Sequence, residues 1–154
     1  MGIISKLRRA RQLSPAQWLL LLQATALLWR AAWMLRSRSL PAMLSWAEGV
    51  ISREKPRFAP AEISELVAIA VCSAMPEGSC LPQSLVTARL LKREGHRASL
   101  VIGTKAARGQ AAGKHVVPFS AHAWVEVPPP EASDPPIVFH RGDHEELVRF
   151  SKSA

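Results

Sequence analysis

Residues 77–95 read E-G-S-C-L-P-Q-S-L-V-T-A-R-L-L-K-R-E-G, a pattern typical of a helix that begins at a cysteine. Pro82 lies in the first turn, where the missing amide hydrogen of proline is tolerated, and Gly95 follows two basic residues as a typical helix end. The first turn of a helix has unpaired N–H groups and a partial positive charge, which favour the thiolate form of a cysteine. Cys80 is therefore a candidate nucleophile.

A second stretch, residues 119–127, reads F-S-A-H-A-W-V-E-V and alternates small apolar residues with larger ones, which predicts a strand. His122 lies near the start of this strand. Several unrelated cysteine enzymes combine a cysteine that opens a helix with a later histidine, which serves as the base. We therefore expect Cys80 and His122 to form a catalytic pair. Trp124, on the same strand, either lines a substrate groove or covers the sheet.

Length and composition predict one globular domain with room for a small helical extension, because 154 residues are 48% hydrophobic and 21% charged. The two cysteines, Cys72 and Cys80, and the lack of a secretory pattern at the start favour a cytoplasmic location. Neither the cysteines nor the five histidines have the spacing of a metal site, so we expect no metal and no other cofactor. Cys72 fits a helical pattern as a small core residue.

The net charge of +8 lies entirely in the first 60 residues, which carry ten Lys/Arg and two Glu (10 − 2 = +8), against ten of each sign afterwards. Such a segment attracts an acidic peptide, an anionic membrane or nucleic acid. It lacks the aromatic and glycine interleaving of nucleic-acid binders, so we expect no nucleic acid partner. We divide the chain into a basic, apolar helical region, residues 1–59, which contacts the substrate or a partner, and a core, residues 60–154.

Three helices are expected before the cysteine helix. The first runs from Pro15, after the Ser14 cap, to about Arg36, and the others cover residues 41–51 and 60–75. The apolar run of the first helix is about twelve residues before an arginine, short of the roughly 20 needed to span a membrane. We therefore expect it to be buried or covered by a partner, with peripheral membrane contact as the less favoured alternative.

Strands are expected at residues 98–103, 119–127 and 137–140, with a loop over residues 104–118 and a proline-rich connection after the second strand. Residues 145–150 form either a turn of helix or a strand. Because helices come first and an antiparallel sheet follows, the predicted fold class is α+β.

The order C-L-P-Q-S-L-x-x-A-x-L-L-K-R-E-G-H-x-A-x-L-V-I-G, a loop and then F-S-A-H-A-W-V-E-V resembles the transglutaminase-like (papain-type) cysteine peptidases. Within them it is most similar to the stand-alone leader peptidases of lasso-peptide biosynthesis. The resemblance covers residues 76–127, and the opening L-S-P-A-Q-W-L-L-L-L-Q-A is also similar to that family. It implies a core in which the cysteine-bearing helix packs on a small antiparallel sheet.

The resemblance implies a cytoplasmic cysteine protease of the Cys-His-Asp type that removes the leader from a ribosomally synthesised lasso-peptide precursor. Cys80 would attack the carbonyl at the leader–core junction and His122 would protonate the leaving amine, without a metal. The backbone N–H of Cys80 is a candidate oxyanion donor, with the Gln83 side chain as a second candidate. The implied partners are the precursor peptide, a leader-recognition protein and an ATP-dependent lasso cyclase.

The third catalytic residue is left open by the sequence. The family has an aspartate about a dozen residues after the histidine, which corresponds to Asp134 here. Relatives join these strands by a tight turn, whereas this chain has a longer proline-rich connection. If Val127 pairs with Ile137, the position opposite His122 is near residue 142, and Asp143 or His140 would orient the imidazole. We favour Asp134 and keep Asp143 and His140 as alternatives.

Two other functions are compatible with the same residues. The chain could be a non-catalytic scaffold of transglutaminase-like fold that binds the precursor and partner proteins without cleavage. It could also be an acyltransferase that joins a thioester to an amine instead of to water.

Overall fold

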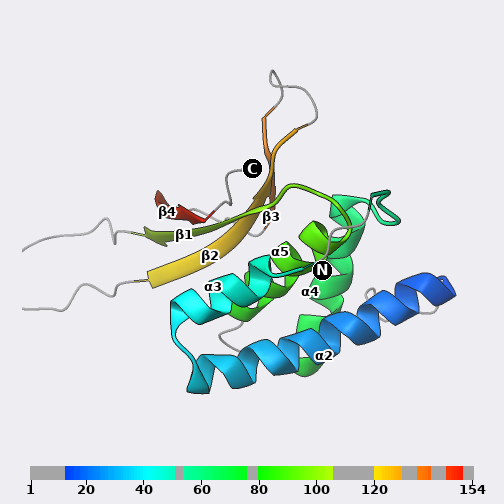
Figure 1. Ribbon diagram of the computed structural model, residues 1–154, viewed down its shortest axis with the longest axis horizontal. Coiled ribbons are helices and arrows are strands. Elements are labelled where there is room, and N and C mark those ends of the chain that lie inside the picture. Colours follow the sequence, from blue (N-terminus) through cyan, green and yellow to red (C-terminus); the bar gives the residue numbers. More distant parts are fainter. Residues whose placement is uncertain are drawn as a thin grey trace, which may run out of the picture.

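A layer of helices lies on one side of a four-stranded sheet in the computed structural model of the chain (Figure 1). The structure describes residues 13–50, 54–75, 80–105, 120–129, 135–139 and 145–150. This arrangement confirms the predicted α+β class.

Helices α2 and α4 begin side by side. Helix α2 (Pro15–Ser37) has a capping box, in which the Gln17 amide donates to the Ser14 hydroxyl at 3.3 Å and the Ser14 amide donates to Gln17 Oε1 at 2.9 Å. Gln17 Nε2 also donates to Glu62 Oε1 at 2.6 Å, in the first turn of α4 (Pro60–Ala74). Both helix starts agree with the predicted ones, because a proline follows each cap residue.

Helix α5 (Cys80–Arg93) is the central element, since it contacts the other three described helices as well as the first two strands. Its end has the predicted glycine: Gly95 has a φ of 91°, its amide donates to the Lys92 carbonyl, and the His96 amide donates to the Leu91 carbonyl. These two bonds form a Schellman motif, which satisfies carbonyls that the last turn leaves unpaired.

Helix α3 (Leu40–Glu48) is held against α5 by cationic side chains. The Arg89 guanidinium lies 4.6 Å from the centre of the Trp46 ring and donates to the Trp46 carbonyl, and Lys92 pairs with Glu48 at 3.4 Å. The predicted helix at residues 41–51 is therefore present, although it begins one residue earlier and ends at Glu48.

The sheet is antiparallel with strand order β3-β2-β1-β4. Its strands are β1 (Ser99–Lys105), β2 (Ser120–Val127), β3 (Ile137–Phe139) and β4 (Glu145–Phe150). Val127 pairs with Ile137, which is the condition under which Asp143 and His140 were considered, and residues 145–150 are a strand. The loop expected from residue 104 was placed too early, because Thr104 and Lys105 continue β1 opposite Ala121 and Ser120. Strand partners on both sides stabilise this extension, which no local pattern reveals.

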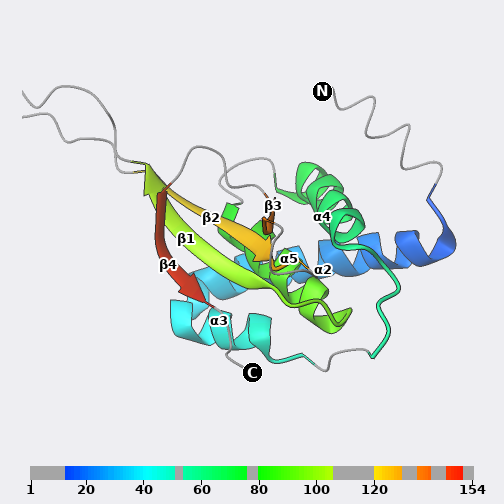
Figure 2. The same cartoon turned by 90° about the horizontal axis from the view of Figure 1, so that it is seen from above.

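The buried core lies between the helices and one face of the sheet, and Figure 2 shows β1 and β2 passing over α5. It draws on both proposed regions of the chain, and the division after residue 59 stays a prediction. Fully buried members include Leu28, Ile63, Val67, Leu85, Leu90 and Val125. Cys72 is exposed, so its assignment to the core was wrong. The buried stripe of α4 ends at Val71, one position before the cysteine.

Candidate active site

Cys80 is the first described residue of α5, in agreement with the predicted helix start, and it is half-buried. A residue at this position has a backbone N–H without a partner inside its own helix. The nearby Pro82 is buried in the first turn, where proline is compatible with helical geometry. Cys80 therefore combines a partly accessible sulfur with the positive end of a central helix.

The start of α5 points toward the His122 end of β2. Six residues after α5 ends at Arg93, β1 begins at Ser99, which pairs with Glu126. The carboxyl end of α5 therefore lies near the Glu126 end of β2, and its amino end lies near the opposite end, as the crossing in Figure 2 shows. The two predicted residues, Cys80 and His122, belong to these neighbouring ends.

One buried hydrogen bond fixes this alignment. The Ser84 hydroxyl donates to the Ala123 carbonyl at 2.8 Å, and Ser84 is only 1% exposed. Ser84 lies one turn after Cys80 on the same side of α5, about 6 Å along the helix axis, and Ala123 adjoins His122. In the described part of the chain, β3 pairs with β2 no further than Val125. At Ala123, α5 therefore donates a hydrogen bond to β2.

His122 lies on the face of β2 that also carries Trp124 and Glu126, because alternate residues of a strand share a face. The opposite face carries Val125 and Val127, which belong to the core beneath the sheet. The His122 and Trp124 rings are stacked, with centroids 6.4 Å apart and an angle of 22° between their planes. His122 itself is half-buried, as an active-site base that must meet substrate requires.

A chain of polar contacts holds the ring beside His122. Trp124 is fully buried, and its indole N–H donates to Glu126 Oε1 at 2.9 Å. The other carboxylate oxygen of Glu126, which is 4% exposed, lies 2.6 Å from a guanidinium nitrogen of Arg149 on β4. Arg149 also pairs with Glu146 at 2.8 Å. Burial of Trp124 fits its interpretation as a residue that covers the sheet.

Glu146 and Glu126, the two acidic partners of Arg149, also raise its pKa. The side-chain hydrogen bond that Arg149 donates to Glu146 raises the pKa of Arg149 above its ordinary value; partial burial opposes this rise, and Glu126 adds to it. Arg149 therefore stays charged at any pH the protein meets. The carboxylate of Glu126 consequently keeps a permanent cationic partner across β1.

The three candidates for the third catalytic residue, Asp134, His140 and Asp143, lie outside the described residues and stay predictions. The observed register of Val127 with Ile137 is the premise on which Asp143 and His140 were considered. Gln83, the second oxyanion candidate, is half-buried in the first turn of α5 and likewise stays a prediction. In the described ranges, no group of three His, Cys, Asp or Glu side chains could hold a metal ion.

Sequence reasoning missed Ser84, Glu126 and Arg149. Ser84 had a signal, since a serine among apolar helix positions one turn after the cysteine implies a buried hydroxyl with a partner. Glu126 had one as well, because a carboxylate within an apolar strand requires a cation or donor nearby. Arg149 had none, since it lies 23 positions further along the chain and meets Glu126 only through the sheet.

Residues 18–134 match the model of a protein family that is described as Transglutaminase-like superfamily. This range includes Cys80, Ser84 and the whole of β2. Searches of curated proteins and of solved structures found no match. The matched range is more than half of the chain, and it contains both the central helix and the strand that form the candidate site. The chain therefore belongs to the transglutaminase-like superfamily.

Proposed function

We propose that this protein is a cytoplasmic cysteine peptidase that removes the leader from a ribosomally synthesised lasso-peptide precursor before macrolactam formation. The observation that carries the proposal is the alignment of α5 with β2 through the Ser84 hydroxyl and the Ala123 carbonyl. This bond joins α5, one turn after Cys80, to β2 at the residue next to His122, which supports a Cys80–His122 pair. Membership in a superfamily that commonly contains cysteine proteases and transferases supports the same chemistry.

In the proposed reaction, the Cys80 thiolate attacks the carbonyl carbon at the leader–core junction, and the backbone N–H of Cys80 donates to the oxyanion. The carbon–nitrogen bond then breaks as His122 gives a proton to the leaving amine of the core peptide. Water attacks the resulting thioester while His122 takes one of its protons. The leader leaves with a new carboxylate, and the thiolate is restored.

Trp124 and Glu126 have a positioning role in this proposal. The buried indole ring stacks on His122, and Glu126 fixes the ring through a hydrogen bond at 2.9 Å. A histidine side chain that rests on a fixed ring has fewer accessible rotamers, which holds it closer to a productive geometry. The Asp134 carboxylate, or the side chain of the alternatives Asp143 or His140, would in addition orient the imidazole tautomer.

The proposed partners follow from the same chemistry. The substrate is the precursor peptide, which a leader-recognition protein presents. The freed amino terminus of the core passes to an ATP-dependent lasso cyclase. Neither a metal nor a cofactor takes part in the proposed steps, since the nucleophile and the base are both side chains.

The test is leader release from the precursor peptide encoded beside this chain's own gene, incubated with the chain and its neighbouring recognition protein and followed by mass spectrometry. We expect a product lighter by the mass of the leader. The substitution Cys80→Ala abolishes this product, because the thiolate is lost, whereas Cys72→Ala leaves it unchanged. Cys72 is a suitable control because it is exposed and lies on another helix.

Leader release by the Cys80→Ala variant would show that the peptidase proposal is wrong. A binding scaffold would bind the precursor without any loss of mass. An acyltransferase would yield a leader carrying the mass of an added amine instead of a free carboxylate. The three functions are therefore distinguished by one set of spectra.

A further inference from the structure

Helix α2 is apolar on two opposite sides. Its buried side contacts the core through Leu20, Ala24 and Leu28, each at most 2% exposed. The opposite side exposes a stripe in which three indoles and two leucines follow one another along the helix; we call it the tryptophan face, and it consists of Trp18, Leu19, Leu22, Trp29 and Trp33. Leu22, Trp29 and Trp33 are each 62% exposed. A helix that is apolar on all sides is normally covered on all sides.

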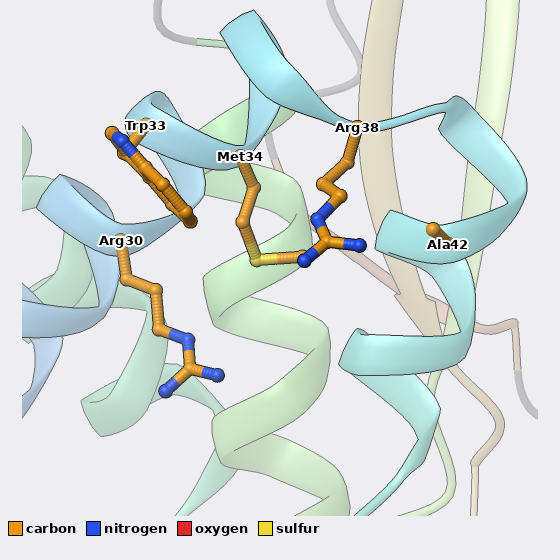
Figure 3. Close-up of a pocket in the computed structure, with 5 residues that line it drawn as sticks. All are labelled: Arg30, Trp33, Met34, Arg38 and Ala42. Atoms are coloured by element: carbon orange, nitrogen blue, oxygen red, sulfur yellow. The ribbon is translucent and has the colours of Figure 1, made fainter.

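A shallow pocket of about 220 Å³ opens beside the tryptophan face. Trp33, Met34, Ala42 and two arginines, Arg30 and Arg38, line it, and Figure 3 shows the guanidinium groups of Arg30 and Arg38 on either side of the Met34 side chain. Within the described ranges, neither arginine is within salt-bridge distance of a carboxylate. Two guanidinium groups around one opening favour an anionic group such as a phosphate.

The described chain before Glu48 carries charge of one sign, since Arg30, Arg36 and Arg38 are its charged residues. Arg89, on the α5 side of the same cluster, has its pKa lowered by burial and then by the neighbouring charges of Arg30 and Arg93. Arg93 pairs with Glu94 at 3.6 Å, whereas Arg30 and Arg89 both lie over the Trp46 ring and, within the described residues, pair with no carboxylate. A polyanionic surface would relieve the repulsion between these two arginines.

We propose that the tryptophan face and the Arg30–Arg38 pocket bind the surface of an anionic lipid bilayer, with α2 lying in the plane of the membrane. Indole rings prefer the boundary between headgroups and acyl chains, where the ring is buried and the N–H stays hydrated. Arginines beside them contact lipid phosphates. An interfacial helix has this combination of Trp and Leu with basic residues and without acids. The inference does not depend on peptidase activity.

The helix lies on the membrane in this proposal and does not cross it. By length and composition α2 could span a bilayer, but the core helix of a soluble protein meets the same criteria, and 33% of the most apolar window of α2 is buried. Spanning would require Leu20, Ala24 and Leu28 to leave the core that they share with α4 and α5. A second copy of the chain is a poor occupant, because two faces of equal positive charge repel each other.

The experiment is co-sedimentation of the full chain with vesicles of phosphatidylcholine alone or of phosphatidylcholine and phosphatidylglycerol in equal parts. We expect binding to the anionic vesicles that weakens as salt is added. The double variant Trp29→Ser/Trp33→Ser lowers the apparent affinity roughly ten-fold or more, because two exposed indoles no longer enter the interface. The double variant Arg30→Gln/Arg38→Gln lowers it by roughly five-fold for each arginine.

Matched controls come from elsewhere on the surface. Val148→Ser removes an apolar side chain that is 47% exposed on the sheet, and Arg97→Gln removes an exposed arginine after α5, so both retain full binding. Circular dichroism of each variant checks the fold. If one variant misfolds, the binding of the unmodified chain to the two vesicle types still tests the proposal. Equal binding to both vesicle types, or binding to neither, overturns the proposal. The proposal is also overturned if the unmodified chain binds no vesicles and the double tryptophan variant loses a complex with the recognition protein. The same holds if that variant loses a dimer of the chain instead.

Discussion

At the scale of single residues, Glu126 is a carboxylate that is 4% exposed and has two partners of different kinds. One oxygen accepts from the indole of Trp124, and the other pairs with Arg149 across β1. The first contact leads to His122, through the stacked rings. The two contacts can therefore be separated by substitution.

We predict that Glu126→Leu lowers kcat for leader release roughly ten- to hundred-fold with little change in KM, because Trp124 and the His122 ring lose their fixed position. Glu126→Gln retains most of kcat, since the amide oxygen still accepts from the indole N–H. Steady-state kinetics of both variants checks this. If Glu126→Gln is as slow as Glu126→Leu, the negative charge matters and the positioning role is wrong.

The sequence predicts single residues well where local rules apply. The left-handed conformation of Gly95 and the cap at Ser14 follow from the sequence, because both depend on residues within four positions. Cys72 was assigned wrongly, since helical spacing alone does not say where the buried stripe of α4 ends. The partner of Glu126 was unpredictable, because it comes from a strand that pairs on the far side of β1.

At the scale of elements, the contact of α5 with β2 depends on packing and on one buried polar contact. The Ser84 hydroxyl reaches the Ala123 carbonyl where β3, as described, no longer pairs with β2. Removal of a buried donor leaves its acceptor unsatisfied, which costs more than the bond itself contributes.

We predict that Ser84→Ala lowers the free energy of unfolding by about 1–3 kcal/mol and also reduces leader release, because the amino end of α5 shifts against β2. Urea denaturation monitored by circular dichroism measures the first effect. Ser73→Ala is the matched control: its hydroxyl bonds to the Ile69 carbonyl on an exposed face of α4, so we expect a change below about 0.5 kcal/mol. Equal effects of the two substitutions would contradict the alignment role of Ser84.

Most elements were predictable, because prolines, cap residues and apolar periods mark their starts. The exception is the length of β1, which continues into a stretch without any strand pattern because β2 and β4 pair with it. The pairing of Val127 with Ile137 entered the sequence analysis only as a condition, and the structure has it. The third catalytic residue is not fixed by local sequence, because several loop positions could reach back to His122.

At the scale of the whole molecule, the two layers have separate surfaces. The sheet carries Glu126 and its partner Arg149, and the helical layer carries the tryptophan face. The sequence located the charge in the first 60 residues but could not say which side of α2 is exposed, because both sides are apolar. Only the packing of α2 against α4 and α5 decides this.

The central claim, a reactive Cys80 with His122 as its base, is tested most directly by the rates at which iodoacetamide alkylates the two cysteines, resolved by peptide mass spectrometry. Exposure alone predicts that Cys72 reacts faster, because Cys72 is exposed and Cys80 is half-buried. We predict the reverse order at neutral pH, since the nucleophile of a cysteine–histidine pair is the more reactive of the two thiols. We also predict that His122→Ala slows Cys80 and leaves Cys72 unchanged. Faster alkylation of Cys72, or a Cys80 rate that is unchanged in His122→Ala, would contradict the pair.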